Sequence, residues 1–151
     1  MEGLFFFWND QKYVKIPFQY TVRNDITSAN QVINSGRMSL NGEKPFILTQ
    51  MKRTIIVTAT GLEDASGLRF LFLLRNSRGN QQYSSGGVGS TQDRIIDTAY
   101  FGNAAFPYIL DPFIYFESNA TIQYEVEDTG GGGAVPYTIY FAFDGFLLEK
   151  A

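Results

Sequence analysis

Cysteine and histidine are both absent from this sequence of 151 residues. Without cysteine the chain has no disulfide, no thiolate nucleophile and no cysteine-ligated zinc. Without histidine it lacks the usual general base near neutral pH, the serine–histidine pair and the commonest metal ligand. Much of the known enzyme repertoire is thereby excluded, so we expect a protein that is not an enzyme and that uses no cofactor.

Charge is also scarce, because charged residues make up 18% of the chain and the net charge is -3. The lysines and arginines form no local cluster, so neither nucleic acid nor an anionic membrane surface is an expected partner. The apolar run at residues 4–8 is shorter than a signal-peptide core or a membrane span. We therefore expect the protein to be assembled in a cytoplasm.

Aromatic residues are plentiful, with 14 Phe and 9 Tyr. Aromatic side chains are enriched in strands, and two stretches alternate apolar with polar residues in the way that half-buried strands do. These stretches are KIPFQYTVR (residues 15–23) and TIQYEVE (residues 121–127). Pro17 within the first of them indicates an edge strand or a bulge.

Other runs are more continuously apolar, which favours strands buried on both faces. Four are strong, at residues 45–60, 68–75, 108–116 and 137–148. Residues 94–102 are a weaker candidate, and residues 28–40 fit either a short strand or a helical turn. Turn clusters separate the runs, so we predict an all-β, single-domain antiparallel β-sandwich, jelly-roll-like, with an N-terminal arm. The arm or first strand is expected at residues 1–12 and the sandwich at residues 13–151.

Four consecutive glycines, residues 130–133, lie between two of these runs. A phosphate-binding loop would need a helix after the glycines, whereas a strand follows here. Glu125, Glu127 and Asp128 would also repel a phosphate. A hairpin loop is therefore the predicted structure of this segment.

Carboxylates supply the remaining acid–base chemistry. The candidate pairs are Asp93 with Asp97, Asp111 with Glu117, and Glu125 with Glu127. No sequence feature creates the apolar pocket that a catalytic acid requires, and a strand would place the last pair on one solvated face. Calcium ligands are conceivable at Asp64, Asp128 and Asp144, but no D-x-D-x-D-G loop is present and turn formation is the favoured interpretation. We expect no metal site.

The N-terminal run Leu4, Phe5, Phe6, Phe7 and Trp8 does not alternate. Burying it would contribute on the order of 5 to 10 kcal/mol, too much for it to stay in water. Two interpretations remain open, a first strand of the core and an arm that binds a neighbouring subunit. Sugar binding is a separate hypothesis, because NQQY (residues 80–83) and YFGN (residues 100–103) combine aromatic and amide side chains.

Three stretches carry a resemblance to a known family. They contain Pro45, Phe46, Ile47 and Thr49; Pro112, Ile114, Ile122, Tyr124, Val126, Asp128, Thr129 and Gly130; and Ile139, Phe141, Phe143, Gly145 and Phe146. Spanning residues 45–148, this pattern resembles a loosely defined group of tailed-phage virion proteins. It contains no catalytic signature.

The resemblance implies a capsid cement or decoration protein of the virion, which binds the major capsid protein as a homodimer or homotrimer and stabilises the shell. Contacts in such proteins lie along sheet edges, loops and terminal arms. The candidate partner-binding residues are Leu4, Phe5, Phe6, Phe7, Trp8, Tyr83, Tyr100 and Phe101. The alternatives are a carbohydrate-binding or receptor-binding fibre module, and a structural protein of the neck, tail or baseplate.

Overall fold

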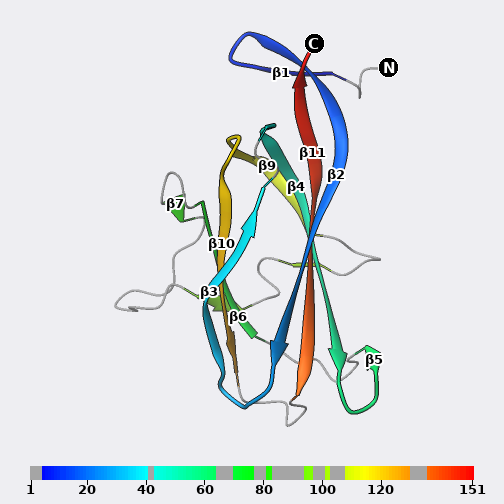
Figure 1. The fold of residues 1–151 in the computed structure, drawn as a ribbon, viewed down its shortest axis with the longest axis vertical. Helices are drawn as coiled ribbons and strands as arrows, with labels where there is room; N and C mark the ends of the chain where they lie inside the picture. Colours follow the sequence, from blue (N-terminus) through cyan, green and yellow to red (C-terminus); the bar gives the residue numbers. More distant parts are fainter. Residues whose placement is uncertain are drawn as a thin grey trace.

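Two antiparallel sheets make up the protein in its computed structural model (Figure 1). The structure describes residues 5–40, 43–63, 70–76, 81–82, 94–96, 101–102, 108–129 and 136–151. These residues contain strands, turns and no helix. The predicted all-β antiparallel sandwich is confirmed.

The larger sheet, sheet A, has six strands in the order β1-β2-β11-β4-β5, with β9 also paired to β4. Its strands are β1 (Phe5–Trp8), β2 (Gln11–Ile26), β4 (Phe46–Val57), β5 (Leu62–Glu63), β9 (Tyr108–Phe116) and β11 (Tyr137–Lys150). The smaller sheet, sheet B, has five strands in the order β3-β10-β6-β7, with β8 also paired to β6. Its strands are β3 (Val32–Ser39), β6 (Phe70–Asn76), β7 (Gln81–Gln82), β8 (Ile95–Ile96) and β10 (Thr121–Asp128).

The connections give the sandwich jelly-roll topology. Strands β2, β11, β4 and β9 lie side by side in sheet A, and β3, β10, β6 and β8 lie side by side in sheet B. The chain passes from β2 to β3 to β4, and later from β8 to β9 to β10 to β11. Each of these steps leads from one sheet to the other. Eight strands, four from each sheet, linked in this way form the jelly-roll arrangement.

The predicted hairpin at the four glycines is wrong. Strand β10 pairs with β3 and β6, whereas β11 pairs with β2 and β4, so the segment between them joins two sheets. The Tyr137 hydroxyl donates a hydrogen bond to Asp128 Oδ1, which ties the two strand ends together across the sandwich. Residues 130–135 themselves lie outside the described residues. Alternation identified β10 and a continuously apolar run identified β11, but neither pattern contained information on which sheet each strand joins.

The core between the sheets is largely aromatic. Phe101 lies at its centre, with ring centroids 4.6 Å from Phe72 and 4.9 Å from Phe141. Tyr124 also packs on Phe141 and donates a hydrogen bond of 2.8 Å to Asn24 Oδ1. Burial raises the pKa of the Tyr124 hydroxyl, an effect that this hydrogen bond opposes. The aromatic residues that suggested strands are thus also the side chains that fill the sandwich.

Close approach of strands requires glycine at two positions. An ideal Cβ on Gly145 of β11 would lie 1.8 Å from the backbone oxygen of Ile47 on β4, at a bulge in their pairing. An ideal Cβ on Gly36 of β3 would lie 2.2 Å from the buried ring of Tyr124. Side chains at these positions would push the strands or the ring away.

Strand β2 has a largely free edge. It pairs with β11 along residues 13–26, but on its other side the described residues provide β1 alone, opposite residues 11–14. Pro17 lies where this second edge is free, so the predicted edge position is confirmed. The expected boundary between residues 12 and 13 falls inside β2.

Two weaker predictions are also resolved. Within residues 28–40 the strand alternative is correct, because β3 covers Val32–Ser39. Residues 94–102 contribute the short strand β8 and a parallel bridge between Gly102 and Lys52 of β4. The start of β1 and the end of β11 lie at the same end of the molecule, opposite the β4–β5 turn (Figure 1).

Candidate interaction surfaces

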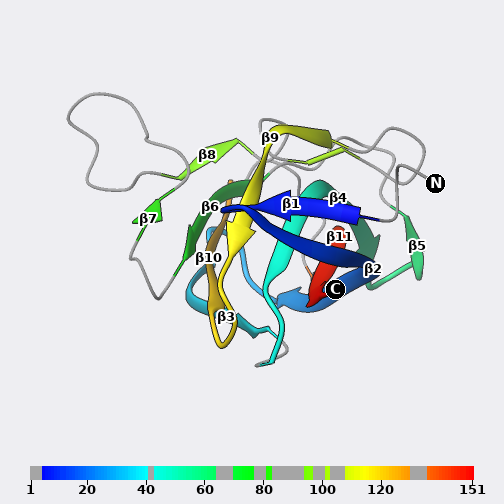
Figure 2. The ribbon, with the colours of Figure 1, turned by 90° about the horizontal axis from the view of Figure 1, so that it is seen from above.

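Strand β1 crosses one end of the molecule toward β9 (Figure 2). A tight turn at Asn9 and Asp10, both with positive φ, joins it to β2. Asparagine and aspartate tolerate this left-handed backbone better than most residues. The turn sets the register in which Phe6 lies opposite Tyr13 and Trp8 opposite Gln11.

Five aromatic side chains, here named the aromatic cluster, connect the two edges of sheet A: Phe6, Trp8, Phe113, Tyr115 and Phe146. Phe6 meets Phe113 at 5.3 Å and Phe146 at 5.5 Å, both edge to face. Trp8 stacks on Tyr115 at 5.2 Å. Because β1 and β9 lie at opposite edges in the strand order, sheet A must curl for these rings to meet. Burial is the main cause that raises the pKa of the Tyr115 hydroxyl.

The aromatic cluster covers the face of sheet A that points away from sheet B. Strand alternation places Phe46 and Leu48 in the core and Ile47 on the opposite face, yet Ile47 is fully buried. Leu148 shares that outer face with Phe146 and is also buried. The prediction of strands buried on both faces is therefore confirmed at this end of β4 and β11.

The other side of β1 carries exposed aromatic rings. Phe5 and Phe7 are 37% and 69% exposed, and Phe18 on the neighbouring β2 is 39% exposed. By register Phe5 and Phe7 share a face with Val14 and Lys12. The Lys12 ammonium lies 3.9 Å from the centroid of the Phe5 ring. We name Phe5, Phe7 and Phe18 the exposed apolar edge, since they border the free edge of β2.

The structure separates the sequence-predicted partner residues into four groups. Phe6 and Trp8 pack against their own chain, while Phe5 and Phe7 face outward. Phe101 is 5% exposed in the core, so its ring is not a surface contact. Leu4, Tyr83 and Tyr100 lie outside the described residues, as do half of the residues in the two predicted sugar-binding stretches.

The carboxylates of β10 form ion pairs on the outer face of sheet B. Arg94 donates to Glu127 at 3.0 Å and to Glu125 at 3.3 Å, and its side chain is 7% exposed. Arg75 pairs with Glu125 at 3.1 Å. The expected solvated face is thus partly covered by arginine. Charge-assisted pairs of this kind give both glutamates a structural role in sheet B.

The other acidic candidates have structural contacts where they are described. Asp128 accepts a hydrogen bond from the backbone amide of Asn30 at 2.9 Å, and Asp144 pairs with Lys52 at 2.7 Å. Within the described ranges, no three acidic side chains gather to hold a metal ion. Asp64, Asp93 and Asp97 lie outside those ranges, and the side chain of Asp111 is likewise not described.

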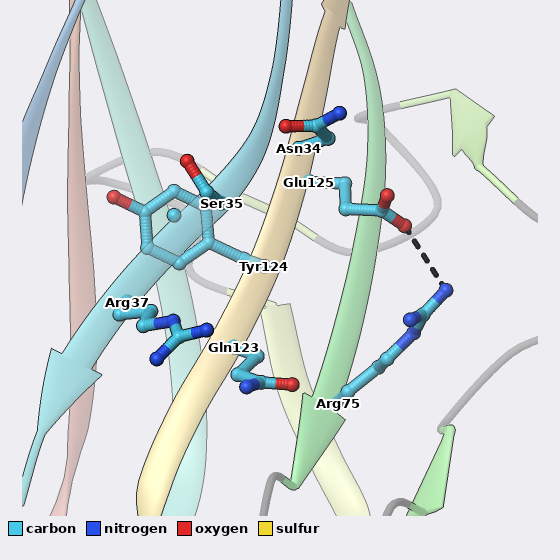
Figure 3. Close-up of a pocket in the computed structure, with 8 residues that line it drawn as sticks. Asn34, Ser35, Arg37, Arg75, Gln123, Tyr124 and Glu125 are labelled. Atoms are coloured by element: carbon cyan, nitrogen blue, oxygen red, sulfur yellow. Dashed lines mark hydrogen bonds and ion pairs between the residues drawn. The ribbon is translucent and has the colours of Figure 1, made fainter.

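A polar pocket of about 140 Å³ opens over a bulge in β3 (Figure 3). Arg37 of β3 and Arg75 of β6 flank Gln123 of β10, which pairs with both residues. The Arg75–Glu125 ion pair forms one side of the pocket. This ion pair neutralises part of the charge of the lining, and the pocket is a small polar depression in the sheet.

A larger groove lies on the outer face of sheet A, toward the β4–β5 turn. It has a volume of about 520 Å³, and its lining includes Arg23, Asp25, Ile56, Thr138 and Tyr140. A second hollow of about 330 Å³ adjoins it at Tyr140. Together these hollows are named the Tyr140 groove.

Sequence reasoning missed the residues that give both surfaces their shape. Phe113, Tyr115 and Phe146 alternate with core residues in runs that read as uniformly apolar, so their separate role was not visible. Tyr140 lies between buried Ile139 and Phe141, and it is 42% exposed. Strict alternation along β11 would place Tyr140 on the outer face of sheet A, opposite to Ile139 and Phe141.

No family model, no curated protein and no solved structure matches this chain. In the part of the chain that is described, a helix with the length and apolar character needed to cross a membrane is absent.

Proposed function

We propose that this protein is a structural subunit of a virus particle, a cement or decoration protein that binds and stabilises the capsid shell. The observation that carries the proposal is the exposed apolar edge. Phe5 and Phe7 are held on a strand whose opposite side is anchored by the aromatic cluster. A rigid strand that presents two phenyl rings has the form of an interface anchor.

Free backbone groups beside these rings favour an assembly role. From residue 15 onward, the outer edge of β2 has no paired strand among the described residues. Unpaired N–H and C=O groups can add a strand from a neighbour, while adjacent apolar rings exclude water from the contact. Burying the parts of the two side chains that are still exposed, 37% of Phe5 and 69% of Phe7, would contribute about 1.5 to 3 kcal/mol.

The proposed partners are the major capsid protein and further copies of this chain, as a homodimer or homotrimer, in the virion. The resemblance to tailed-phage virion proteins supports this choice over other assemblies. A structural role in the neck, tail or baseplate uses the same surface and differs in its location.

The test is binding to purified phage shells assembled without this protein. We expect stoichiometric cosedimentation and a raised shell melting temperature. The double substitution F5S/F7S should abolish binding while the isolated chain stays folded, because both rings face solvent. Leu62→Ser is the matched control, since Leu62 is 68% exposed at the opposite end of the molecule. Failure of the unchanged protein to bind shells, collars or tails would end the proposal.

A further inference from the structure

We propose that the Tyr140 groove is a binding site for a neutral saccharide chain, with a sugar ring stacked on Tyr140. This inference does not depend on the virion assignment. It concerns the end of sheet A that lies away from the aromatic cluster. It also differs in position from the two sugar-binding stretches that the sequence suggested.

The groove offers a flat aromatic platform. Tyr140 lies on β11, the central strand, and its ring is 42% exposed. Its neighbours on the same face of the strand are the small residues Thr138 and Ala142, and Thr54 lies opposite it on β4. The Arg23 guanidinium, opposite Tyr140 on β2, lies 6.0 Å from the ring centroid, so the small neighbours leave open the part of the ring that points away from Arg23. A sugar presents an apolar face of C–H groups with polar edges, and this face can stack on the open part of the ring.

Four of the five charged groups in and beside the groove form ion pairs with one another, and the guanidinium of the fifth, Arg53, lies 5.9 Å from the centroid of the Phe70 ring. Arg23 pairs with Asp25 at 3.1 Å on one side of Tyr140, and Lys52 pairs with Asp144 at 2.7 Å on the other. Balanced pairs give no long-range attraction to a polyanion or polycation. They do supply hydrogen-bond donors and acceptors at fixed positions, which suits hydroxyl groups that both donate and accept.

An extended peptide fits this groove poorly. Peptides that add to sheets bind through unpaired backbone groups, and β11 is paired along both edges, with β2 and with β4. A saccharide needs only side-chain contacts and a stacking surface. The two hollows of about 520 and 330 Å³ meet at Tyr140, so a chain of several sugar rings can lie across the tyrosine.

The test is an NMR titration of the whole chain with maltohexaose, cellohexaose, xylohexaose and chitohexaose. We expect saturable shifts of the Thr54, Thr138 and Ala142 amides with at least one of them. Tyr140→Ala should weaken that binding roughly tenfold or more, which corresponds to about 1.4 kcal/mol or more. Tyr140→Phe should retain it, because the ring remains. Phe7→Ala, an exposed ring at the other end, should leave it unchanged.

Two outcomes would overturn the inference. One is that none of the four oligosaccharides shifts these amides while the melting temperature shows a folded protein. The other is that sedimentation finds an oligomer that Tyr140→Ala converts to monomer, because a second copy of the chain would then cover the groove. The effect of substituting Phe5 and Phe7 on shell binding has no influence on either outcome. The saccharide site and the shell-binding role can therefore be refuted independently.

Discussion

Replacing Phe6 with alanine should loosen β1 from the rest of the molecule, whereas replacing its neighbour Phe7 should not. The Phe6 ring contacts Trp8, Phe113 and Phe146, at centroid distances of 6.2, 5.3 and 5.5 Å. Phe7 points to the opposite side of the same strand and is 69% exposed. The two substitutions remove the same atoms from adjacent positions, so their difference isolates the aromatic cluster.

The expected size follows from burial. Truncating a fully buried phenylalanine to alanine costs about 3 to 5 kcal/mol, lost ring contacts included, and the partial burial of Phe6 reduces this to roughly two thirds. We expect Phe6→Ala to lower the free energy of unfolding by about 2 to 3 kcal/mol, or roughly 5 to 10 °C in melting temperature for a chain of this size. Phe7→Ala should stay within about 0.5 kcal/mol.

Tryptophan fluorescence provides a local assay, because Trp8 is the single tryptophan and stacks on Tyr115. In Phe6→Ala the emission of Trp8 should shift to the red, toward that of a solvated indole. In urea the fluorescence change should precede the loss of far-UV circular dichroism, which reports the whole sandwich. Equal stabilities of the two variants, with unchanged Trp8 emission, would refute the idea that the aromatic cluster anchors β1.

Three further predictions concern other parts of the fold. Gly145→Ala should lower the free energy of unfolding in urea by more than about 3 kcal/mol, because its Cβ would collide with a backbone carbonyl of β4. Gly61→Ala is the control: its Cβ meets open space at a φ of 67°, so it should cost only about 1 kcal/mol. Similar values for both variants would contradict the packing at the bulge. Arg94→Met should cost about 2 to 4 kcal/mol by calorimetry, because it leaves the two glutamates of β10 without their shared cation; a neutral effect would mean that solvent already screens them. The hydrogen bond from Thr138 and the guanidinium of Arg23 hold the pKa of Asp25 below its ordinary value of 3.8. The ionised carboxylate therefore stabilises the folded chain above that pH, and this stabilisation is lost as the pH falls through the lowered pKa. Thr138→Val should raise the pKa of Asp25 toward 3.8 in an NMR titration, and an unmoved value would contradict this assignment.

The local pattern was enough to predict the positions of β2, β4, β6, β9, β10 and β11, whereas it left β1 and β3 open between two interpretations. Alternation in residues 121–127 anticipated β10, whose side chains alternate between core and surface, and the free edge at Pro17 followed from the missing N–H of proline. Continuous apolar runs anticipated burial on both faces of β4 and β11 at the end where β1 covers them. These properties depend on a residue and its immediate neighbours.

Pairing between distant strands was not visible in the same way. The four glycines suggested a hairpin because the sequence shows only that two strands flank them, and the choice of sheet depends on long-range packing. The aromatic cluster could not be predicted for the same reason, since Phe6 and Phe113 come together only through the curl of sheet A. Phe101 was expected at the surface, yet its ring fills the gap between Phe72 and Phe141.

The start of β1 and the end of β11 lie at the same end of the molecule, and this has a practical consequence. An affinity tag or fluorescent label attached at either end would lie next to Phe5 and Phe7 and would shield them from a partner. Pull-down experiments with such a fusion would then report weak association for reasons unrelated to the protein. A short peptide label inserted in the exposed turn at residues 58–61 would project from the far end and leave those rings accessible.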